Sequence, residues 1–468
     1  MKHDMKLKNF KLGILLAVLM ASLLLVGCSV HRINEKPQVD VKTRTAFSVA
    51  SEDVVFRKPW WQSLNRPALN ELIQQALVNN YNVAQTVAIL EQTRAVARQT
   101  AANRLPQIGL SGNANKLIEG SSFQGDTLGL NLELDWEIDL WNRIGTAAKA
   151  DRLEAQARVA DIDFLKLTLT AEVANAYFGA VAAKQQIILL TEQVKLDQEL
   201  QRILKLRLKN GVGTNVEVLQ QLARVADSET LIPLAEADLA VFENRLDVLL
   251  GEQPDGKFRV AVDENLAFSS TLPAIGVPSA LLLNRPDLVA MRTELIAADA
   301  DIGVAIADRF PRVTLLGVFG YEDSDSNVGS AAALAVGFVQ PLLDWGQRKA
   351  EVKRNKALYR ERLAAYTQLY LEAVEDVENA LVQENKQREF LVRLNQQKKV
   401  LQQAVNAADR RFKQGVDDYQ PVIAILQELR DVERDLVEQQ LILINIRIEL
   451  FRAIGGPIKQ SGQITANK

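Results

Sequence analysis

Residues 127–140 read TLGLNLELDWEIDL, and this stretch decides how the fold is interpreted. Leucine, tryptophan or isoleucine occupies every even position, while a polar residue or glycine occupies every odd one. Alternation with a period of two over this length predicts a β-strand with one apolar and one acidic face. The pattern suits both a soluble sheet packed on a core and a strand that faces lipid, so the strand by itself leaves both open.

The surrounding sequence predicts three further strands. Residues 107–114 alternate more weakly and precede the first strand across an expected turn at 117–126. A second pair is expected at 313–321 and 334–340, joined by a polar loop at 322–332, and small apolar residues on both parities leave its facing ambiguous. Membrane barrels need about eight strands or more, and an open edge in lipid leaves backbone groups unsatisfied. If these strands lie in a membrane, several copies of the chain must assemble.

The strands belong to a unit that is written twice. Leu105-Pro106 recurs as Phe310-Pro311, an offset of 205 (311 − 106), and Trp141 recurs as Trp345, an offset of 204 (345 − 141). The segments KNGV at 209–212 and KQGV at 413–416 repeat the second offset, as do Leu250-Gly251 and Ile454-Gly455. A duplicated unit predicts a pseudo-symmetric architecture in which each repeat covers surface that the other cannot bury alone.

Each repeat also predicts very long helices. Residues 347–414 contain no glycine or proline, and residues 143–209 contain only Gly145 and Gly179. A continuous helix of that length would extend roughly 100 Å. Both stretches end at a glycine turn before a returning helix. A 4-3 spacing of apolar residues predicts a coiled-coil seam at Leu153, Ala157, Ala160, Phe164, Leu167, Ala171, Ala174, Phe178 and Val181.

The N-terminus indicates export. A basic start precedes an apolar run at 12–26, about fifteen residues long, which is too short to span a bilayer and suits a signal peptide. Leu25-Val26-Gly27-Cys28 resembles the lipobox of bacterial lipoproteins, which implies cleavage before Cys28 and lipid, including palmitate, on its sulfur. Ser29, in place of aspartate, implies sorting to the outer membrane. The alternative is an ordinary signal peptide with an incidental cysteine; Cys28 is the only cysteine, so no intramolecular disulfide can form.

We therefore divide the chain into segments. These are a lipoprotein signal peptide at 1–27, a lipid-anchored tether at 28–65, the first repeat at 66–260, a linker at 261–284, the second repeat at 285–457 and a C-terminal tail at 458–468. The net charge of −3 and the lack of a basic stretch argue against nucleic acid as a partner. His3 and His31 are the only histidines, so we expect no catalytic triad, no metal site and no cofactor besides the lipid on Cys28.

Several motifs, in this order and together with the duplication, resemble the outer-membrane efflux family of TolC-like and OprM-like channels, in its lipoprotein (NodT-type) branch. They are PWWQ at 59–62, RPDL at 285–288, Phe310-Pro311, QPLLDWG at 340–346 and GVDDY at 415–419. The resemblance covers nearly all of the mature chain. It implies a mixed α+β membrane protein: a homotrimer in which three four-stranded contributions close one 12-stranded β-barrel, joined to an α-helical periplasmic tunnel.

The resemblance also implies a function. Such a protein is an outer-membrane channel of a Gram-negative bacterium, not an enzyme. It gives substrates passive passage from the periplasm to the exterior when docked to a periplasmic adaptor (membrane fusion protein) and an inner-membrane pump of RND or ABC type. The hairpin tips implied for adaptor docking are Gly211, Val212, Gly213, Thr214, Gly415 and Val416.

The implied periplasmic entrance comprises Asp417, Asp418, Tyr419 and Gln420. OprM-like members commonly carry leucine just after the tyrosine and aspartate four residues later; here Gln420 and Ala424 stand there, so that gate is not carried over. Asp417 and Asp418 are expected either to form a ring of carboxylates that favours cations and raises its own pKa values, or to cap the returning helix.

The acidic face of the first strand is the other expected site. Its four carboxylates are Glu133, Asp135, Glu137 and Asp139. They could line the lumen and disfavour anions, although a solvated face is the alternative for the lower two. Two other classes stay open. A lipid-anchored periplasmic coiled-coil scaffold would explain the helices and the lipobox but not the alternating hairpins. A carboxylate-based hydrolase would need a pocket-forming domain for which the repeats leave no room.

Overall fold

The computed structural model describes residues 29–48, 59–115, 127–261, 264–267, 272–273, 275–324 and 327–456. The predicted lipid attachment site, Cys28, and the predicted turn at 117–126 lie outside these residues. The chain divides into two compact units, which are described separately. The first unit includes the described residues of 1–42, 87–160 and 287–369, and the second includes those of 43–86, 161–286 and 370–468.

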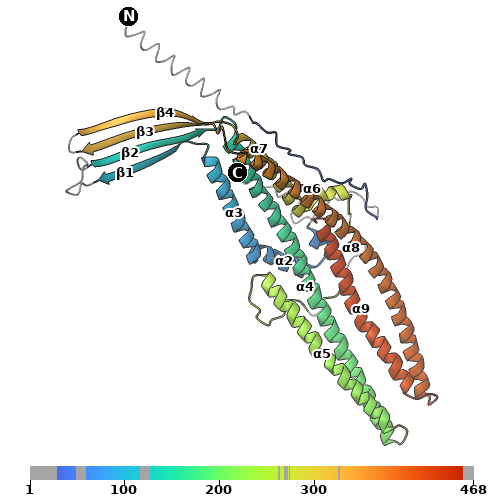
Figure 1. Ribbon diagram of the computed structural model, residues 1–468. Coiled ribbons are helices and arrows are strands. Elements are labelled where there is room, and N and C mark those ends of the chain that lie inside the picture. The colour runs from blue at the N-terminus through green and yellow to red at the C-terminus, as the bar shows by residue number, and fades with distance from the viewer. Residues whose placement is uncertain are drawn as a thin grey trace. The chain divides into compact units, whose positions relative to one another are not determined.

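The first unit contains one antiparallel sheet with the strand order β1-β2-β3-β4 (Figure 1). Strands β1 (Gln107–Asn115) and β2 (Thr127–Ile138) come from the first repeat; β3 (Arg312–Ser324) and β4 (Asn327–Val339) come from the second. The expected loop at 322–332 is wrong, because Ser324 pairs with Asn327 and the ladder runs almost to the turn. Continued pairing satisfies backbone groups that a longer loop would leave to water.

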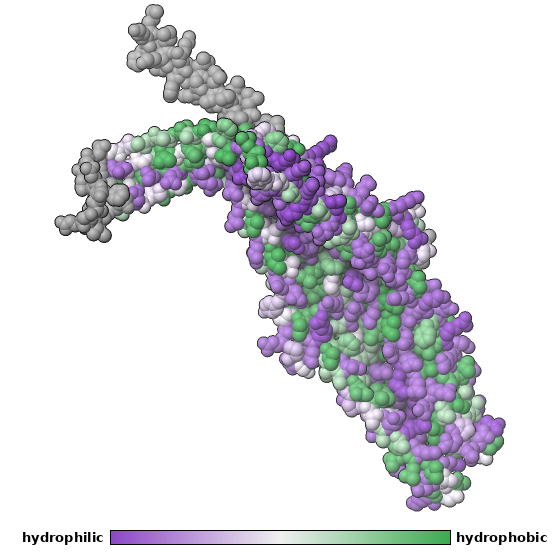
Figure 2. All heavy atoms as spheres, viewed as in Figure 1, coloured by the Kyte–Doolittle hydropathy of each residue, from purple (hydrophilic) through white to green (hydrophobic). Residues whose placement is uncertain are grey.

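The register settles the facing of β3 and β4, which the sequence leaves ambiguous. Leu132 of β2 lies opposite Leu110 of β1 and Phe319 of β3, and Phe319 lies opposite Ala332 of β4. Residues directly opposite in an antiparallel pair share a face. The apolar face of β2 therefore continues through Phe319 and the even positions of β4, including Phe338. Apolar residues gather along the sheet in Figure 2.

The opposite face is polar along β1 and β2, mixed along β3, and lined by small residues near the centre of β4. Glu133 of β2 lies opposite Gly109 of β1 and Val318 of β3, and Val318 lies opposite Ala333 of β4. Along β4 this face carries only small side chains near its centre: Ala331, Ala333, Ala335 and Gly337. One face of the sheet is thus apolar except near the β3–β4 turn, where Asp323 and Ser330 lie, and the other combines carboxylates with a stripe of alanine and glycine.

The helices of the two repeats correspond closely. In the first repeat, a 3-10 turn (Trp60–Leu64), α2 (Pro67–Asn79) and α3 (Tyr81–Ala102) precede the hairpin, and α4 (Arg143–Lys209) and α5 (Asn215–Leu249) follow it. In the second, η2 (Pro278–Ala280), α6 (Leu281–Asn284) and α7 (Pro286–Ala307) precede β3, and α8 (Gln347–Lys413) and α9 (Gln420–Ala453) follow β4. The two long helices that the scarcity of glycine and proline predicts, α4 and α8, are confirmed. Within the described ranges, none of the helices combines the length and apolar character needed to traverse a bilayer.

Burial along α4 follows the predicted seam. Seven of the nine seam residues are buried, and Leu153 and Phe164 are half-buried. Gly179 lies inside this helix because α5 approaches closely there: a Cβ atom at Gly179 would lie 2.4 Å from the Phe242 ring. The glycine that interrupts the predicted helix therefore serves packing and not a turn.

The duplication is visible in the contacts that end each repeat. Gly251, just after α5, has a φ of +79°, and a Cβ atom there would lie 2.5 Å from the Asn79 carbonyl oxygen. Gly455, just after α9, has a φ of +70°, and its Cβ atom would lie 2.7 Å from the Asn284 carbonyl oxygen. A positive φ and close backbone approach both favour glycine. Each returning helix thus docks on the end of the short helix that opened its own repeat.

Candidate functional site

The tip of the first helical hairpin is an exposed turn. Gly211 has a φ of +73° after α4 ends at Lys209, and Val212 is 65 % exposed. Thr214 and Glu217 then form a capping box: the Glu217 amide donates to Thr214 Oγ1 (3.3 Å), and the Thr214 amide donates to Glu217 Oε2 (2.7 Å). Such reciprocal bonds satisfy the open amides at a helix start. The expected docking residues 211–214 therefore lie on an accessible turn that leads into a capped helix.

The tip of the second hairpin differs in its chemistry. Gly415 has a φ of +72°, and Val416 is exposed. Asp417 accepts two hydrogen bonds from the Arg411 guanidinium, one of them 2.9 Å long from NH2 to Oδ1. The Arg411 guanidinium lowers the pKa of Asp417, with its hydrogen bond as the main cause. Within one chain this is the opposite of the raised pKa expected for a carboxylate ring, because the neighbouring cation favours the ionised carboxylate.

The alternative that these aspartates cap α9 is wrong within the described chain. The N-cap position is Tyr419, and no side chain caps the helix there. Asp418 is exposed and directly precedes the cap. Asp418 and the Arg411–Asp417 pair therefore remain on the surface of the tip.

Tyr419 does not face an opening. Its side chain is 1 % exposed and packs 5.0 Å from the Phe412 ring, in a cluster with Leu204, Val218, Val422 and Ile423. Burial raises the pKa of Tyr419 to about 12, since the phenolate form would lose its hydration. The expectation that Tyr419 belongs to the entrance is wrong for this conformation: it is a core residue that holds the tips of the two hairpins together. Gln420 is exposed, as an entrance residue requires.

Polar contacts join the two hairpins below this cluster. Gln420 donates to Gln220 Oε1 on α5 (2.6 Å), and Arg224 donates to the Ile423 carbonyl (3.2 Å). Arg430 donates to the buried carboxylate of Asp197 on α4 (2.5 Å). The sequence offers no signal for Asp197, because carboxylates are abundant on all four long helices.

Asp197 is the centre of this network. Its carboxylate also accepts from Gln221 Nε2 (2.9 Å) and Ser228 Oγ (3.1 Å), both on α5. Beside it lies a cavity of about 260 Å³ between α5 and α9, whose lining includes three arginines and two aspartates: Arg224, Arg430, Arg434, Asp227 and Asp431. Burial lowers the pKa of Arg224, although the nearby Asp197 carboxylate opposes that shift. A single aspartate thus connects α4, α5 and α9.

The four carboxylates of the predicted acidic strand divide into two pairs. Glu133 lies on the polar face of the sheet, where Ser111 Oγ donates to it (2.7 Å), and Asp135 is exposed on the same face. Glu137 accepts two hydrogen bonds from the Arg143 NH2 group (2.9 and 2.8 Å). Asp139 lies beyond the end of β2 and accepts from the amides of residues 144 (3.1 Å) and 145 (2.7 Å).

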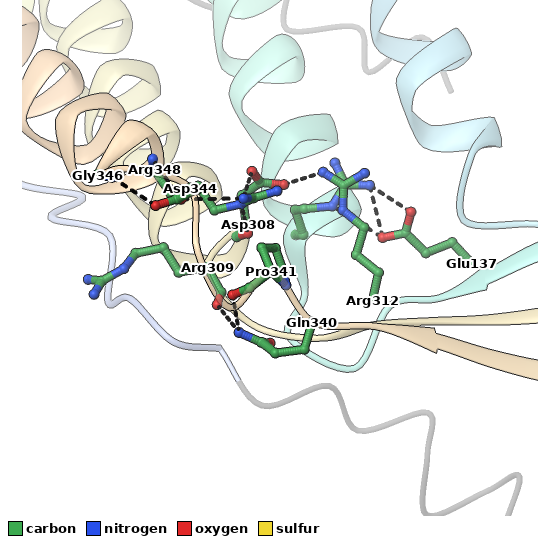
Figure 3. A network of polar contacts seen from close by, with 10 residues as sticks. Glu137, Asp308, Arg309, Arg312, Gln340, Pro341, Asp344, Gly346 and Arg348 are labelled. Atoms are coloured by element: carbon green, nitrogen blue, oxygen red, sulfur yellow. Dashed lines mark hydrogen bonds and ion pairs between the residues drawn. The ribbon is translucent and has the colours of Figure 1, made fainter.

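Glu137 keeps its place on the polar face of β2, opposite Thr314, while it pairs with Arg143, whereas Asp139 lies beyond the strand and so is not part of the predicted acidic face. Both residues hold the junction between β2 and α4, Glu137 through an ion pair and Asp139 by capping the helix start. Figure 3 shows Glu137 at this junction. Glu322 of β3 lies opposite Gly129 and shares the face of Glu133 and Asp135. The sequence pattern predicts a loop at Glu322 and so gives no indication that it shares this face.

Comparisons with known proteins agree with this architecture. The family model for outer membrane efflux proteins matches residues 72–252 and 277–456. The pyoverdine export outer membrane protein OpmQ of Pseudomonas aeruginosa is 27% identical over 428 residues, which cover 88% of this chain and 90% of OpmQ. The cation efflux system protein CusC of Escherichia coli is 25% identical over 458 residues, which cover 94% of this chain and 98% of CusC.

Solved structures show the same fold. The outer-membrane channel OprN superposes with a TM-score of 0.82 at 26% identity, covering 92% of this chain and 99% of OprN. The open state of the MtrE outer membrane channel of Neisseria gonorrhoeae superposes with a TM-score of 0.84 at 23% identity, over 92% of this chain and 99% of MtrE. Since the family model matches both repeats, the chain belongs to the outer membrane efflux protein family and is an outer-membrane channel of an export system, not an enzyme.

Proposed function

We propose that three copies of this chain close their sheets into one twelve-stranded β-barrel, joined to an α-helical periplasmic tunnel. The sheet carries this proposal. Among the described residues, the outer edges of β1 and β4 have no strand partner, and large apolar side chains such as Leu110, Leu130 and Phe338 are exposed on one face. Unpaired strand edges in lipid are unfavourable by several kcal/mol for each open backbone group. Closure by further copies removes both edges.

The number of copies follows from the strand count. Each chain supplies four strands, so two copies reach only the smallest known membrane barrels, with about eight strands, whose interior is filled by side chains. Three copies give twelve strands and room for a water-filled passage. The polar face, with Glu133, Asp135 and Glu322, then lines the passage, and the apolar face meets lipid. The relatives named as outer-membrane channels support this arrangement.

The channel is passive in this proposal. The hairpin tips dock a periplasmic adaptor of the membrane fusion type, and an inner-membrane pump of RND or ABC type supplies the energy. The exposed Val212 and Val416 give each tip an apolar contact point on a turn held by a positive-φ glycine. Names of relatives such as "Pyoverdine export outer membrane protein" and "Cation efflux system protein" support a place in an export system.

Lipid on Cys28 anchors the chain to the outer membrane in the same proposal. The lipobox-like Leu25-Val26-Gly27-Cys28 supports it, and one relative is named as a probable outer membrane lipoprotein. Cys28→Ser is expected to abolish incorporation of labelled palmitate and to leave the signal peptide uncleaved. Ser29→Ala, one residue further on, serves as the control and is expected to be labelled normally. Equal labelling of both variants would exclude Cys28 as the attachment site.

The decisive experiment combines conductance with mass. The full chain, purified in detergent, is incorporated into planar bilayers, and its oligomeric mass is measured on the same sample. Discrete conductance steps from a particle of three copies support the proposal. A stable monomer without conductance contradicts it and favours a lipid-anchored scaffold without a pore.

A further inference from the structure

The junction between the two repeats inside one chain has a defined geometry. Trp141, between β2 and α4, stacks on Phe310 with ring centroids 4.8 Å apart and an interplanar angle of 28°. Its Nε1 atom donates to the Pro311 carbonyl (2.8 Å). Trp141 of the first repeat thus packs on Phe310-Pro311 of the second repeat, just after α7. We call this contact surface the seat of Trp141. The seat lies directly beside the pairing of β2 with β3.

The two repeats also form equivalent hydrogen bonds where the sheet meets the helices. Trp136, near the end of β2, donates to the Arg104 carbonyl (2.9 Å), and Gln340, just beyond β4, donates to the Arg309 carbonyl (3.4 Å). Trp136 and Gln340 are 204 positions apart (340 − 136), and Arg104 and Arg309 are 205 apart (309 − 104). Figure 3 shows Gln340 turned toward Arg309. Residues of β4 therefore correspond to β2 at an offset of 204, and residues of β3 correspond to β1 at 205.

The equivalent junction after the second repeat is open. Trp345 corresponds to Trp141 but is 90 % exposed, and the neighbouring Leu342 and Leu343 are exposed as well. At the other end of the sheet, Leu105-Pro106 corresponds to Phe310-Pro311, and Leu105 is 64 % exposed. Trp141 is thus packed on its seat, whereas Trp345 and the equivalent seat, Leu105-Pro106, are exposed. The last two flank the two open edges of the sheet, β4 and β1.

We infer that Trp345 of one copy packs on Leu105-Pro106 of the next copy, so that the contact between copies repeats the contact between repeats. The inference rests on the proposed assembly of several copies and specifies how they meet. The Trp345 ring covers the Leu105 side chain, and its Nε1 atom donates to the Pro106 carbonyl. The contact is heterologous: the surface around Trp345 of one copy meets the surface around Leu105 of the next, which suits a closed ring.

The same equivalence specifies the strand register between copies. Leu132 lies opposite Phe319 where β2 pairs with β3. Moving Leu132 forward by 204 gives Val336, and moving Phe319 back by 205 gives Ala114. Val336 of one copy is therefore expected opposite Ala114 of the next, with the other pairs of the ladder following.

The facing of the strands supports this register independently. Val336 lies opposite Leu315 on the apolar face, and Ala114 lies opposite Leu128 on that same face. The expected pairing thus joins apolar face to apolar face. A shift by one residue, as a uniform offset of 204 would give, joins an apolar face to a polar one.

Cysteine cross-linking tests the register in the full chain. Directly opposed residues of an antiparallel pair have Cα atoms about 4.5 to 5.5 Å apart, within the range that a disulfide bridges. Val336→Cys with Ala114→Cys is expected to give ladders of two and three linked chains after mild oxidation. Leu132→Cys with Phe319→Cys, the equivalent pair within one chain, is the matched control and is expected to give only single chains. The unsubstituted chain controls for Cys28.

Two displaced cysteine pairs distinguish the expected register from shifted registers. Val336→Cys with Asn113→Cys places the thiols on opposite faces, and Val336→Cys with Gly112→Cys displaces them by two residues. Both are expected to cross-link at least tenfold more slowly than the Val336–Ala114 pair. Preferential linking of either displaced pair overturns the register. An unlinked Val336–Ala114 pair in a conducting three-copy particle overturns the inference and leaves the proposed function standing. Monomers in every sample overturn both.

Substitution at Trp345 tests the seat. Trp345→Ala is expected to lower the temperature at which the purified assembly dissociates on gels, and Trp345→Phe, which keeps a ring but loses the N–H donor, is expected to lower it less. The helical circular dichroism of the separated chains is the control for folding and is expected to be unchanged. Dissociation of Trp345→Ala at the temperature of the unsubstituted protein contradicts the contact.

Discussion

Arg430 on α9 and Asp197 on α4 form an ion pair that is almost completely buried, with 2.5 Å between NH1 and Oδ2. Because α9 belongs to the second repeat and α4 to the first, this pair ties the repeats together inside the second unit. Gln221 and Ser228 donate to Asp197 as well, so its carboxylate is fully engaged. Within a low-dielectric interior, such a pair is weak as a source of stability but strongly unfavourable to break.

Asp197→Asn is therefore expected to destabilise the protein. The substitution keeps the side-chain shape but leaves the Arg430 guanidinium buried without a counter-charge. We expect the free energy of unfolding to fall by about 3 to 5 kcal/mol, measured from the guanidinium-induced loss of helical circular dichroism. Glu199→Gln is the control, since Glu199 pairs with Arg202 on the exposed side of the same helix. Equal effects of the two variants would contradict the role of Asp197.

Gly179→Ala is expected to loosen the packing of α4 on α5. The added methyl group would lie 2.4 Å from the Phe242 ring, which must move. Overpacking of this kind lowers stability by about 1 to 3 kcal/mol, and the thermal unfolding midpoint measures it. Combining Gly179→Ala with Phe242→Leu is expected to recover part of the loss. Gly109→Ala, where a Cβ atom meets nothing within 4 Å, is the control.

Asp301 on α7 is expected to make stability depend on pH. Burial, together with Glu154 and Asp151, raises the pKa of Asp301 from 3.8 to about 6, and Arg362 and Arg354 oppose the shift. Since the folded protein holds this proton more tightly than the unfolded chain, the free energy of unfolding falls as pH rises from about 4 to about 6. Above that range the buried carboxylate remains destabilising.

Asp301→Asn removes this dependence. At pH 7 we expect the variant to be more stable by about 1 to 2 kcal/mol, after allowing for the partial exposure of the carboxylate. The difference from the unsubstituted protein is expected to vanish at about pH 4, as measured by thermal unfolding across that pH range. Glu91→Gln, at an exposed position on α3, is the control. A difference that is independent of pH would show that Asp301 acts through packing and not through its charge.

The acidic tip is expected to influence ion selectivity. Asp417 is held by Arg411, and Asp418 is exposed beside it. Replacing both with asparagine leaves Arg411 as an uncompensated cation, so we expect the isolated channel to lose cation preference. The zero-current potential across a salt gradient measures this. Asp255→Asn, which also removes a carboxylate paired with a cation, is the control. An unchanged potential in the double variant would exclude these aspartates from the conducting path.

Much of the fold could be predicted from local patterns. The alternation at 127–138 specifies a strand because a pleated chain presents successive side chains to opposite faces. The ends of α4 and α8 follow from the first glycine turns after long stretches of helix-forming residues. The repeat offset specifies which elements correspond. Family membership follows from the order of these elements and their motifs.

Other features depend on contacts between distant segments, and no local pattern carries them. The facing of β4 depends on pairing with β3, because small apolar residues on both parities suit either face. Asp139 continues the strand alternation by sequence but caps α4, because the strand ends one residue earlier. Tyr419 lies in a polar tip sequence yet is buried by Phe412.

The predictable features differ from the others for one physical reason. Periodicity, turns and duplication are properties of neighbouring residues, so the sequence by itself determined the elements, their order and the pseudo-symmetry of the two repeats. Register, burial and the choice of ion-pair partner depend on free energies that arise only when distant surfaces exclude water together. The tertiary structure therefore decided which carboxylates lie on the polar face of the sheet, which hold the junction between β2 and α4, and that Asp197 pairs with Arg430.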